Sequence, residues 1–210
     1  MNHSSHVVEV RQTAVFSKWL NRLRDRDARL RIATRIRRLE LGNAGDVKAV
    51  GEGVSEMRIP YGPGYRVYFV QDGNAVVVLS AAATSRHRFA TLPRPGRWPR
   101  NSDMALNTTK FDIQDHLKTP EDRAAYLEAA FGEGEAAFIT HALNDVARAI
   151  GMTDVARSAG ITREGLYKAL GEKGDPKLST LLGVARALGV RLSVSPTVPN
   201  DNMAESGPSA

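Results

Sequence analysis

The chain has 210 residues, of which 42% are hydrophobic and 25% are charged, values typical of one or two globular domains. It contains no cysteine, which excludes disulfides, thiol catalysis and cysteine-bound zinc, and its five scattered histidines predict neither a metal site nor a bound cofactor. Because the sequence shows no long apolar run and no secretory signal, we expect a cytoplasmic protein with no membrane partner.

The net charge of +6 is unevenly distributed along the chain. Residues 1–103 contain 18 Lys and Arg against 9 Asp and Glu, whereas residues 104–210 contain 11 against 14. A basic half and an acidic half indicate nucleic acid as a partner of the first half and association between the two halves. Two solvated surfaces would give the same counts, so charge alone does not decide between these interpretations.

The first half predicts a helical hairpin on a small antiparallel sheet, an α+β domain over residues 1–80. Residues 7–11 alternate as a short strand, and two amphipathic helices follow between Thr13 and Gly42. The polar face of the second helix is rich in arginine, and we expect it on the outer surface. Turns rich in glycine and proline separate three further predicted strands, at residues 54–59, 65–70 and 75–79.

Residues 81–103 mix arginines with prolines and are predicted to form a basic linker. The second domain, residues 104–195, is predicted to be all-α apart from a short strand at 190–194. A helix start at Thr119, followed by Pro120 and two acids, and further helices at 135–150 and 178–188 support this prediction. The residues that follow, 196–210, are rich in Pro, Gly and Ser and predict a disordered tail.

The most specific pattern lies between Met152 and Leu170. Small Ala156 and Gly160 allow two short helices to cross through a tight turn, with Gly160 in the left-handed conformation. This pattern predicts a helix-turn-helix at 152–170 that binds operator DNA in the major groove, and a plain helical hairpin is the alternative. We expect a homodimer, because specific recognition normally spans two half-sites. The side chains predicted to contact DNA are Thr162, Arg163, Glu164, Tyr167 and Lys168.

Two sets of motifs resemble the partners of a bacterial type II toxin–antitoxin pair. The segments Glu56-Met-Arg-Ile59 and Gly62-Pro-Gly-Tyr-Arg-Val-Tyr-Phe69 are similar to a toxin of the RelE/ParE superfamily, in its HigB-like, phage-derived branch. Residues 104–195 resemble the antidote protein of an addiction module with an XRE-like (lambda-repressor-like) helix-turn-helix. The two are separate proteins in that branch, so the resemblance implies a fusion, with pairing inside one chain or between chains.

The resemblance implies a toxin module that cuts mRNA on the ribosome without metal, and an antidote module that neutralises it and represses its own operon. Attack of a ribose 2′-hydroxyl on the neighbouring phosphate requires cations and groups that transfer protons. Arg58 and Arg66 could converge on one phosphate, while the arginine-rich helices dock on ribosomal RNA. Alternatively, the tyrosines pack in the sheet and the arginines form surface ion pairs. The predicted catalytic residues are Lys48, Arg58, Arg66, Tyr65 and Tyr68.

One departure from the family favours a second hypothesis. After the last strand, the family continues with a basic turn similar to Gly-Gly-Asp-Lys-Ser, whereas this chain reads Ser80-Ala-Ala-Ala-Thr-Ser85. Loss of that turn favours a transcriptional regulator with a catalytically dead toxin-like domain, while intact Lys48, Arg58 and Arg66 favour an active fusion. A gyrase-poisoning toxin, the other activity of the superfamily, fits the HigB-like motifs less well.

Overall fold

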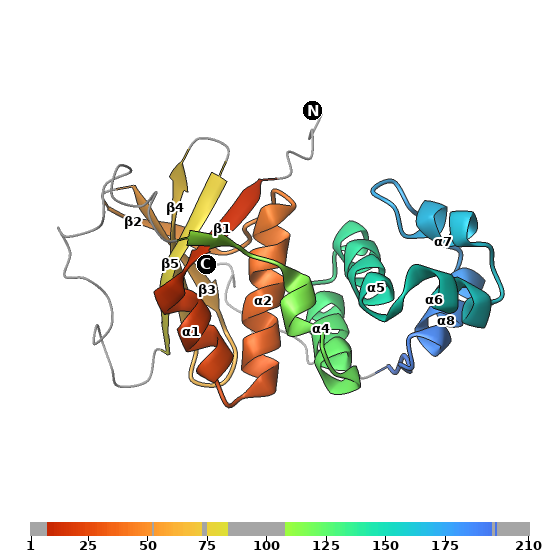
Figure 1. Cartoon of the computed structure of the whole chain (residues 1–210). Helices are drawn as coiled ribbons and strands as arrows, with labels where there is room; N and C mark the ends of the chain where they lie inside the picture. The colour runs from red at the N-terminus through yellow and green to blue at the C-terminus, as the bar shows by residue number, and fades with distance from the viewer. Residues whose placement is uncertain (1–7, 52, 73–74, 84–107, 195, 197–210) are drawn as a thin grey trace, which may run out of the picture.

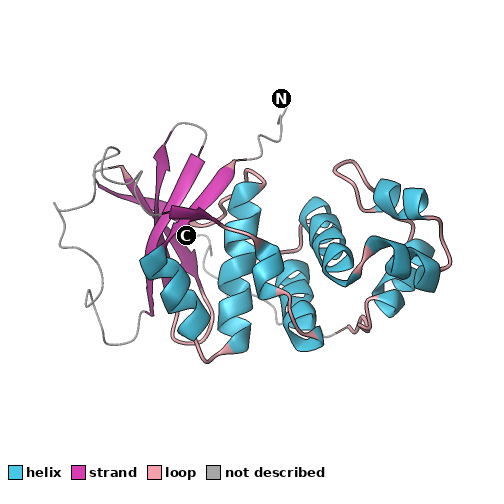
Figure 2. Ribbon diagram, viewed as in Figure 1, coloured by secondary structure: helices cyan, strands magenta, loops and turns pink. Residues whose placement is uncertain are grey.

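The computed structural model describes residues 8–51, 53–72, 75–83, 108–194 and 196. A sheet lies at one end of the molecule, helices α1 (Ala14–Arg22) and α2 (Arg26–Glu40) pack on one of its faces, and the helices of the second half continue beyond α2 (Figures 1 and 2). In the part of the chain that the structure describes, no helix is long and apolar enough to cross a membrane.

The sheet is mixed and has the strand order β2-β3-β4-β5-β1-β6. The expectation of a purely antiparallel sheet is therefore wrong, because β1 pairs in parallel with β5. Two strands were not predicted: β2, of which four residues in five are exposed, and β6, which has three residues and pairs with β1. The strands are β1 (Glu9–Thr13), β2 (Val47–Gly51), β3 (Val54–Ile59), β4 (Tyr65–Asp72), β5 (Ala75–Ala83) and β6 (Thr108–Lys110).

Side-chain caps fix where the first two helices begin. The Thr13 hydroxyl accepts a hydrogen bond from the Phe16 amide at 3.2 Å, and the Asp25 carboxylate accepts one from the Ala28 amide at 3.0 Å. Phe16 and Leu20 of α1 and Leu30, Ile32 and Ile36 of α2 are fully buried in the core, α1 against the sheet and α2 between the sheet and α4, which confirms the predicted helical hairpin.

Among the described residues of the second half, β6 is the one strand and the other regular elements are helices. Thr119 and Asp122 form a reciprocal capping box at the start of α4, as the sequence predicts from Thr119-Pro120. The predicted strand at 190–194 is wrong, since these residues have no regular secondary structure. The elements are the 3-10 helix η1 (Ile113–His116) and the helices α4 (Pro120–Gly132), α5 (Ala136–Ile150), α6 (Met152–Ala159), α7 (Arg163–Ala169) and α8 (Leu178–Ala187).

The two halves of the chain pair with each other. Strand β6 adds to the edge of the sheet beside β1, and one continuous set of buried apolar residues extends from the sheet through α2 and α4 to α8. Residues 81–83, expected in the linker, belong to β5. The rest of the predicted linker and the predicted tail beyond residue 196 lie outside the described residues.

Candidate functional site

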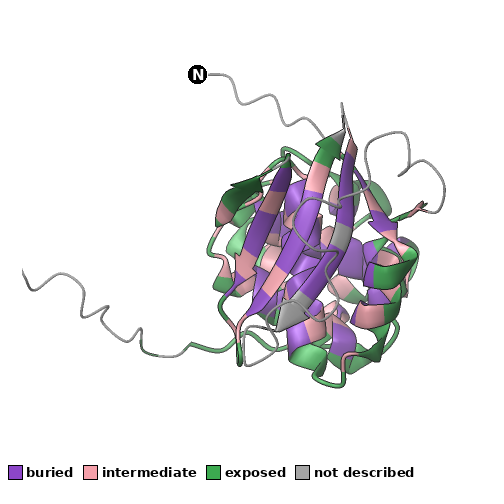
Figure 3. Cartoon of the chain, turned by 90° about the vertical axis from the view of Figure 1, so that its left-hand side faces the viewer, coloured by how far each residue is buried: buried purple, intermediate pink, exposed green. Residues whose placement is uncertain are grey.

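A polar cluster lies on the face of the sheet that points away from α1 and α2, where Tyr68 packs with Val54 and Val77 outside the main core. Figure 3 shows this face of the sheet turned toward the viewer. Glu56 on β3 accepts hydrogen bonds from Arg66 Nη1 at 2.8 and 2.9 Å, from Arg58 Nε at 3.1 Å and from the Tyr68 hydroxyl at 3.0 Å. We call Glu56, Arg58, Arg66 and Tyr68 the Glu56 cluster. Three of the five predicted catalytic residues thus meet at one carboxylate.

The contacts within the cluster set the protonation states of Glu56 and Tyr68. Burial alone would raise the pKa of Glu56, which is 4% exposed, but hydrogen bonds from Arg66, Arg58 and Tyr68 outweigh it and lower the pKa. Burial and the neighbouring Glu56 raise the pKa of Tyr68 to about 12. At neutral pH, Glu56 is therefore a carboxylate and Tyr68 keeps its proton. The side chains of Arg58 and Arg66 remain 41% and 40% exposed.

Of the other two predicted residues, Lys48 lies beside this cluster and Tyr65 lies on the opposite face of the sheet. Lys48 is exposed on β2, opposite Glu56 in the strand register. Tyr65 is 5% exposed and packs edge-on against Trp19 in the core, with ring centroids 6.3 Å apart, on the opposite face of the sheet. Tyr65 is therefore part of the sheet packing.

Sequence reasoning missed Glu56 and Ser80. Residues two apart in a strand lie on the same face, so the sequence Glu56-Met-Arg58 places the Glu56 carboxylate beside the Arg58 guanidinium. Glu56 could therefore have been predicted from this spacing. Ser80 is opposite Tyr68 in the register and 4% exposed, and its hydroxyl oxygen is buried without a hydrogen-bond partner. At this end of β5, Ser80 and the alanines after it contribute no cation.

The arginine-rich face of α2 contacts the second half of the chain, so the expectation that it forms an outer surface is wrong. The physical reason is charge complementarity: acidic side chains of α4, α5 and their connection cover it. Side-chain exposure of the arginines ranges from 10% to 33%. The ion pairs join Arg29 to Asp122, Arg31 to Glu128, Arg35 and Arg38 to Glu133, Arg38 to Glu135, and Arg37 to Asp145.

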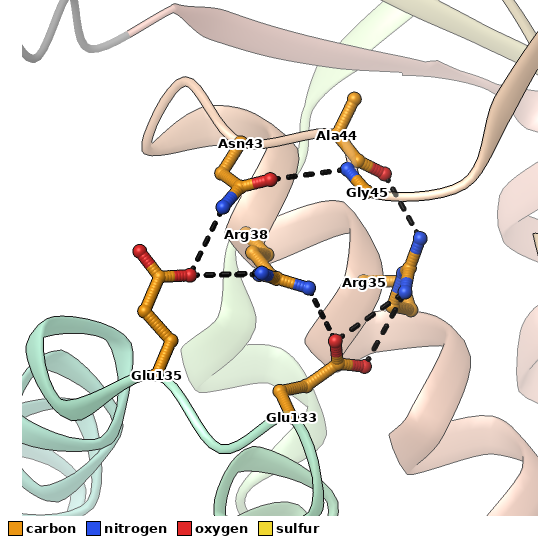
Figure 4. Close-up of polar contacts among 7 residues, drawn as sticks. All are labelled: Arg35, Arg38, Asn43, Ala44, Gly45, Glu133 and Glu135. Atoms are coloured by element: carbon orange, nitrogen blue, oxygen red, sulfur yellow. Dashed lines mark hydrogen bonds and ion pairs between the residues drawn. The ribbon is translucent and has the colours of Figure 1, made fainter. Parts of the chain in front are cut away.

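Figure 4 shows the part of this interface that we call the acidic clamp, formed by Glu133 and Glu135. Glu133 bonds Arg35 and Arg38, while Glu135 accepts from Arg38 Nη2 at 2.8 Å and from the amide of Asn43 at 3.0 Å. Gly45 has φ +64°, and a Cβ there would lie 2.3 Å from Arg35 Nη2. Glycine at this position lets the loop after α2 close over Arg35.

Beside the clamp, the most deeply buried charge of the interface is Asp145, which is 2% exposed. It accepts from Arg37 Nε at 2.8 Å, from Arg37 Nη2 at 3.1 Å and from the Tyr126 hydroxyl at 3.0 Å. Burial would lower the pKa of Arg37, but the hydrogen bonds and charge of Asp145 raise it, so the pair stays ionised.

The five residues predicted to contact DNA are gathered at α7, and all are exposed. Gly160 takes the left-handed conformation between α6 and α7, with φ +70°. The Thr162 hydroxyl caps α7 by accepting from the Gly165 amide at 2.9 Å, and Leu166 is fully buried beneath the helix. The Arg163 guanidinium lies 5.5 Å from the ring centroid of Tyr167, while Glu164 and Lys168 complete the exposed set.

Comparison with known proteins identifies the second half. Residues 107–196 match the model of a family described as probable addiction module antidote proteins. An uncharacterized protein of Haemophilus influenzae is 43% identical over 91 residues, which is 43% of this chain and 94% of that protein. The chain thus belongs to this antidote family, which places it in the context of toxin–antitoxin modules.

A second uncharacterized protein of Haemophilus influenzae is 40% identical over 72 residues, which is 34% of this chain and 73% of that protein. Because each match covers most of the relative and less than half of this chain, both relatives are much shorter than this chain. No solved structure matches the chain.

Proposed function

We propose that the chain is a fused toxin–antidote protein. Its sheet half would be a RelE/ParE-like, HigB-like module that cuts mRNA on the ribosome, and its helical half the antidote that neutralises it. The observation that carries the proposal is the interface: the acidic half, which belongs to an antidote family, covers the arginine helix of the basic half through a buried, charge-paired contact. The existence of two shorter relatives is consistent with a fusion.

The Glu56 cluster supplies the groups that metal-independent RNA cleavage requires. Glu56, ionised at neutral pH, would accept the proton of the ribose 2′-hydroxyl as its oxygen attacks the phosphorus. The partly exposed Arg58 and Arg66 would hold the phosphate oxygens as negative charge increases on them. Tyr68 would give its proton to the departing 5′-oxygen, leaving a 2′,3′-cyclic phosphate and a 5′-hydroxyl. The exposed Lys48 would add positive charge beside the Glu56 cluster.

The helical half would bind operator DNA through α6 and α7 as a helix-turn-helix and repress its own operon. The exposed Arg163–Tyr167 pair on α7 and the buried Leu166 below it fit a helix that presents one face to the major groove. As a homodimer, the protein would contact two half-sites.

Two observations favour a second candidate, a DNA-binding regulator whose sheet half is catalytically dead. Glu56 already occupies the space between Arg58 and Arg66, where a phosphate would bind. In addition, the sequence Ser80-Ala-Ala-Ala-Thr-Ser85 stands where the toxin branch that the sheet half resembles has a basic turn. Both candidates share the interface and the DNA-binding half, so cleavage is the property that separates them.

Induced expression in bacteria distinguishes the two. Residues 1–103 should arrest growth when expressed alone, and residues 104–210 supplied separately should restore it. The same fragment with Arg66→Ala should not arrest growth, and circular dichroism of both purified fragments shows whether they are folded. If the folded wild-type fragment leaves growth unchanged, the sheet half is dead and the regulator is the better description.

DNA binding is tested on the full chain with a fragment of its own promoter. Arg163→Ala should weaken binding about tenfold, since it removes one contact of about 1–3 kcal/mol to a base edge or phosphate. Arg22→Ala, which removes an equal charge from an exposed position on α1, is the matched control. Equal affinities of the two variants in a gel-shift titration would contradict a role for α7.

A further inference from the structure

We propose that a hollow at the contact between the two halves binds a free α-amino acid with an apolar side chain. Arg148 holds the carboxylate of this ligand, Glu172 holds its ammonium group, and apolar residues around Phe138 contact its side chain. The site is separate from the Glu56 cluster and from the exposed face of α7. It therefore gives the chain a small-molecule ligand that neither the proposed toxin activity nor the proposed DNA binding requires.

Three segments of the chain form the walls of this hollow, which has a volume of about 320 Å³. The sheet half contributes Leu41 and Asn43, which follow directly after α2, and the antidote half contributes α5. Glu172 comes from the connection between α7 and α8. Small-molecule sites have volumes from about 300 Å³ upward and occur preferentially where domains meet. An occupant of this hollow thus touches both halves of the chain.

Helix α5 presents one side to the hollow. Ala137, His141, Asn144 and Arg148 all line it, and they follow one another at intervals of four, three and four residues. Residues at this spacing lie on one side of a helix, here over a length of about 16 Å. The buried side chains of α5 lie on its other sides, so this mainly polar stripe takes no part in the core.

The polar residues around the hollow divide into two groups. Arg38 and Asn43 bond Glu135 within the acidic clamp, and Arg37 bonds Asp145, so these side chains already have partners. Among the residues that the structure describes, the polar lining side chains that make no hydrogen bond or ion pair are His141, Asn144, Arg148 and Glu172. One cation, one anion, one imidazole and one amide are therefore available to a ligand.

The two free charges indicate a ligand that carries both signs. A purely anionic ligand bound to Arg148 would face the carboxylate of Glu172, and a purely cationic one would face the guanidinium. Burial lowers the pKa of His141 and the charge of Glu172 acts in the opposite direction, which places that carboxylate near the imidazole. At neutral pH the uncharged imidazole and the amide of Asn144 can hydrogen-bond either end of the ligand. An α-amino acid carries its two charges on neighbouring atoms and meets this requirement.

The apolar part of the lining accounts for the side chain of the ligand. Leu41, Ala137 and Phe138 are the apolar residues of the hollow, and they come from both halves of the chain. A volume of this size holds about ten water molecules, and hence an amino acid such as leucine or phenylalanine. Displacing that water from apolar surface favours binding of an apolar side chain.

The test is isothermal titration calorimetry of the full chain with L-leucine and with L-phenylalanine. Leucinamide lacks the carboxylate and N-acetyl-leucine lacks the ammonium group, so each should bind at least about tenfold more weakly than leucine. Arg148→Gln and Glu172→Gln should each weaken the binding of leucine by a similar factor. The matched controls, Arg22→Gln and Glu9→Gln, change exposed residues outside the lining and should bind leucine like the wild type.

Combining variants and analogues assigns each end of the ligand to its residue. The Arg148→Gln variant should no longer distinguish leucine from leucinamide, and the Glu172→Gln variant should no longer distinguish leucine from N-acetyl-leucine. Because both halves form the hollow, leucine should also raise the midpoint of thermal unfolding of the wild-type chain. This shift should disappear in Arg148→Gln.

The inference is overturned if neither amino acid binds at millimolar concentration, or if the two analogues bind as well as leucine. It is also overturned if Arg148→Gln and Glu172→Gln bind leucine like their controls. These measurements involve neither RNA cleavage nor operator DNA. Failure to bind an amino acid would therefore leave the proposed function standing, and binding would not require a catalytically active sheet half.

Discussion

The sheet half carries two groups of arginines, and they differ in the origin of their carboxylates. In the Glu56 cluster, the acid lies on the same sheet, and two partly exposed arginines converge on it. At the α2 interface, each acid but Glu40 comes from the other half of the chain, and the arginines are mostly covered. Arginines on one domain can therefore serve a local polar cluster or a contact with another segment, and the position of the acidic partner decides which.

The two groups of arginines should also differ in how much they contribute to stability. Removing one partner of a buried ion pair leaves a charge without compensation, whereas an exposed pair is screened by water and contributes little. Substitutions in the two groups should therefore change stability to different extents, although the residue types are the same.

The largest effect is expected for Asp145→Ala, which leaves Arg37 and the Tyr126 hydroxyl without their shared acceptor in a buried site. We expect the free energy of unfolding to fall by about 3 kcal/mol, the lower end of the cost of breaking a buried ion pair, because Arg37 keeps its ion pair with Glu40. Asp154→Ala removes an exposed carboxylate that pairs with Arg157 and is the control. Urea unfolding of the full chain measures both, and a loss at Asp145 no larger than at Asp154 would contradict a structural role for this pair.

A smaller effect is expected for Gly45→Ala, which tests the loop that closes over the clamp. The substitution combines a left-handed backbone at φ +64° with a clash against Arg35, whose guanidinium is held by Glu133 and the Ala44 carbonyl. We expect a loss of about 2–3 kcal/mol. Gly62→Ala has a similar φ of +54° and nothing within 4 Å of its Cβ, so it isolates the backbone cost of about 1–2 kcal/mol. Equal losses in thermal unfolding would mean that Arg35 moves aside freely.

Glu56→Gln should cost less stability, about 1–2 kcal/mol, because the buried carboxylate loses charge-assisted hydrogen bonds but both arginines of the cluster remain partly exposed to water. An amide keeps one acceptor for the arginines, whereas the proposed proton acceptor is lost. Growth arrest by residues 1–103 should therefore disappear although the fragment stays folded. Arrest by a folded Glu56→Gln fragment would remove Glu56 from the mechanism.

Local signals in the sequence predict much of this fold. Thr119-Pro120 gives the start of α4, and Gly160 gives the turn between α6 and α7, since each depends on a few neighbouring residues. Strand β6 was missed because its three residues become a strand only by pairing with β1, almost a hundred positions earlier. Such pairing leaves no local pattern.

The arginine face of α2 shows why the candidate site was only partly predictable. A polar helix face is ordinarily assigned to solvent, but here an acidic face of another segment covers it. Charge asymmetry between the two halves predicted their association without giving its place. Tyr65 was misplaced for a related reason: proximity to Arg66 and Tyr68 in sequence does not decide which face of the strand it occupies.

The smallest expected effect is a difference in pH dependence, which compares the two regions in one experiment. Burial lowers the pKa of His116, which stacks on Phe111 beneath the interface, so the folded state favours its neutral form. Its contribution to stability is complete above the unfolded pKa of about 6.5 and decreases as pH falls below it. The pKa of Glu56 is also lowered, by its hydrogen bonds, and its contribution decreases only below about 4.5. Burial also lowers the pKa of His141, so both histidines contribute in this range. Between pH 7 and 5, unfolding should therefore become easier in the wild-type chain, while His116→Gln reduces this slope to the part that His141 contributes and Glu56→Gln leaves it unchanged. If Glu56→Gln instead changed the dependence of the unfolding free energy on pH between 7 and 5, the loss of stability in this range would come from the Glu56 cluster and not from the interface.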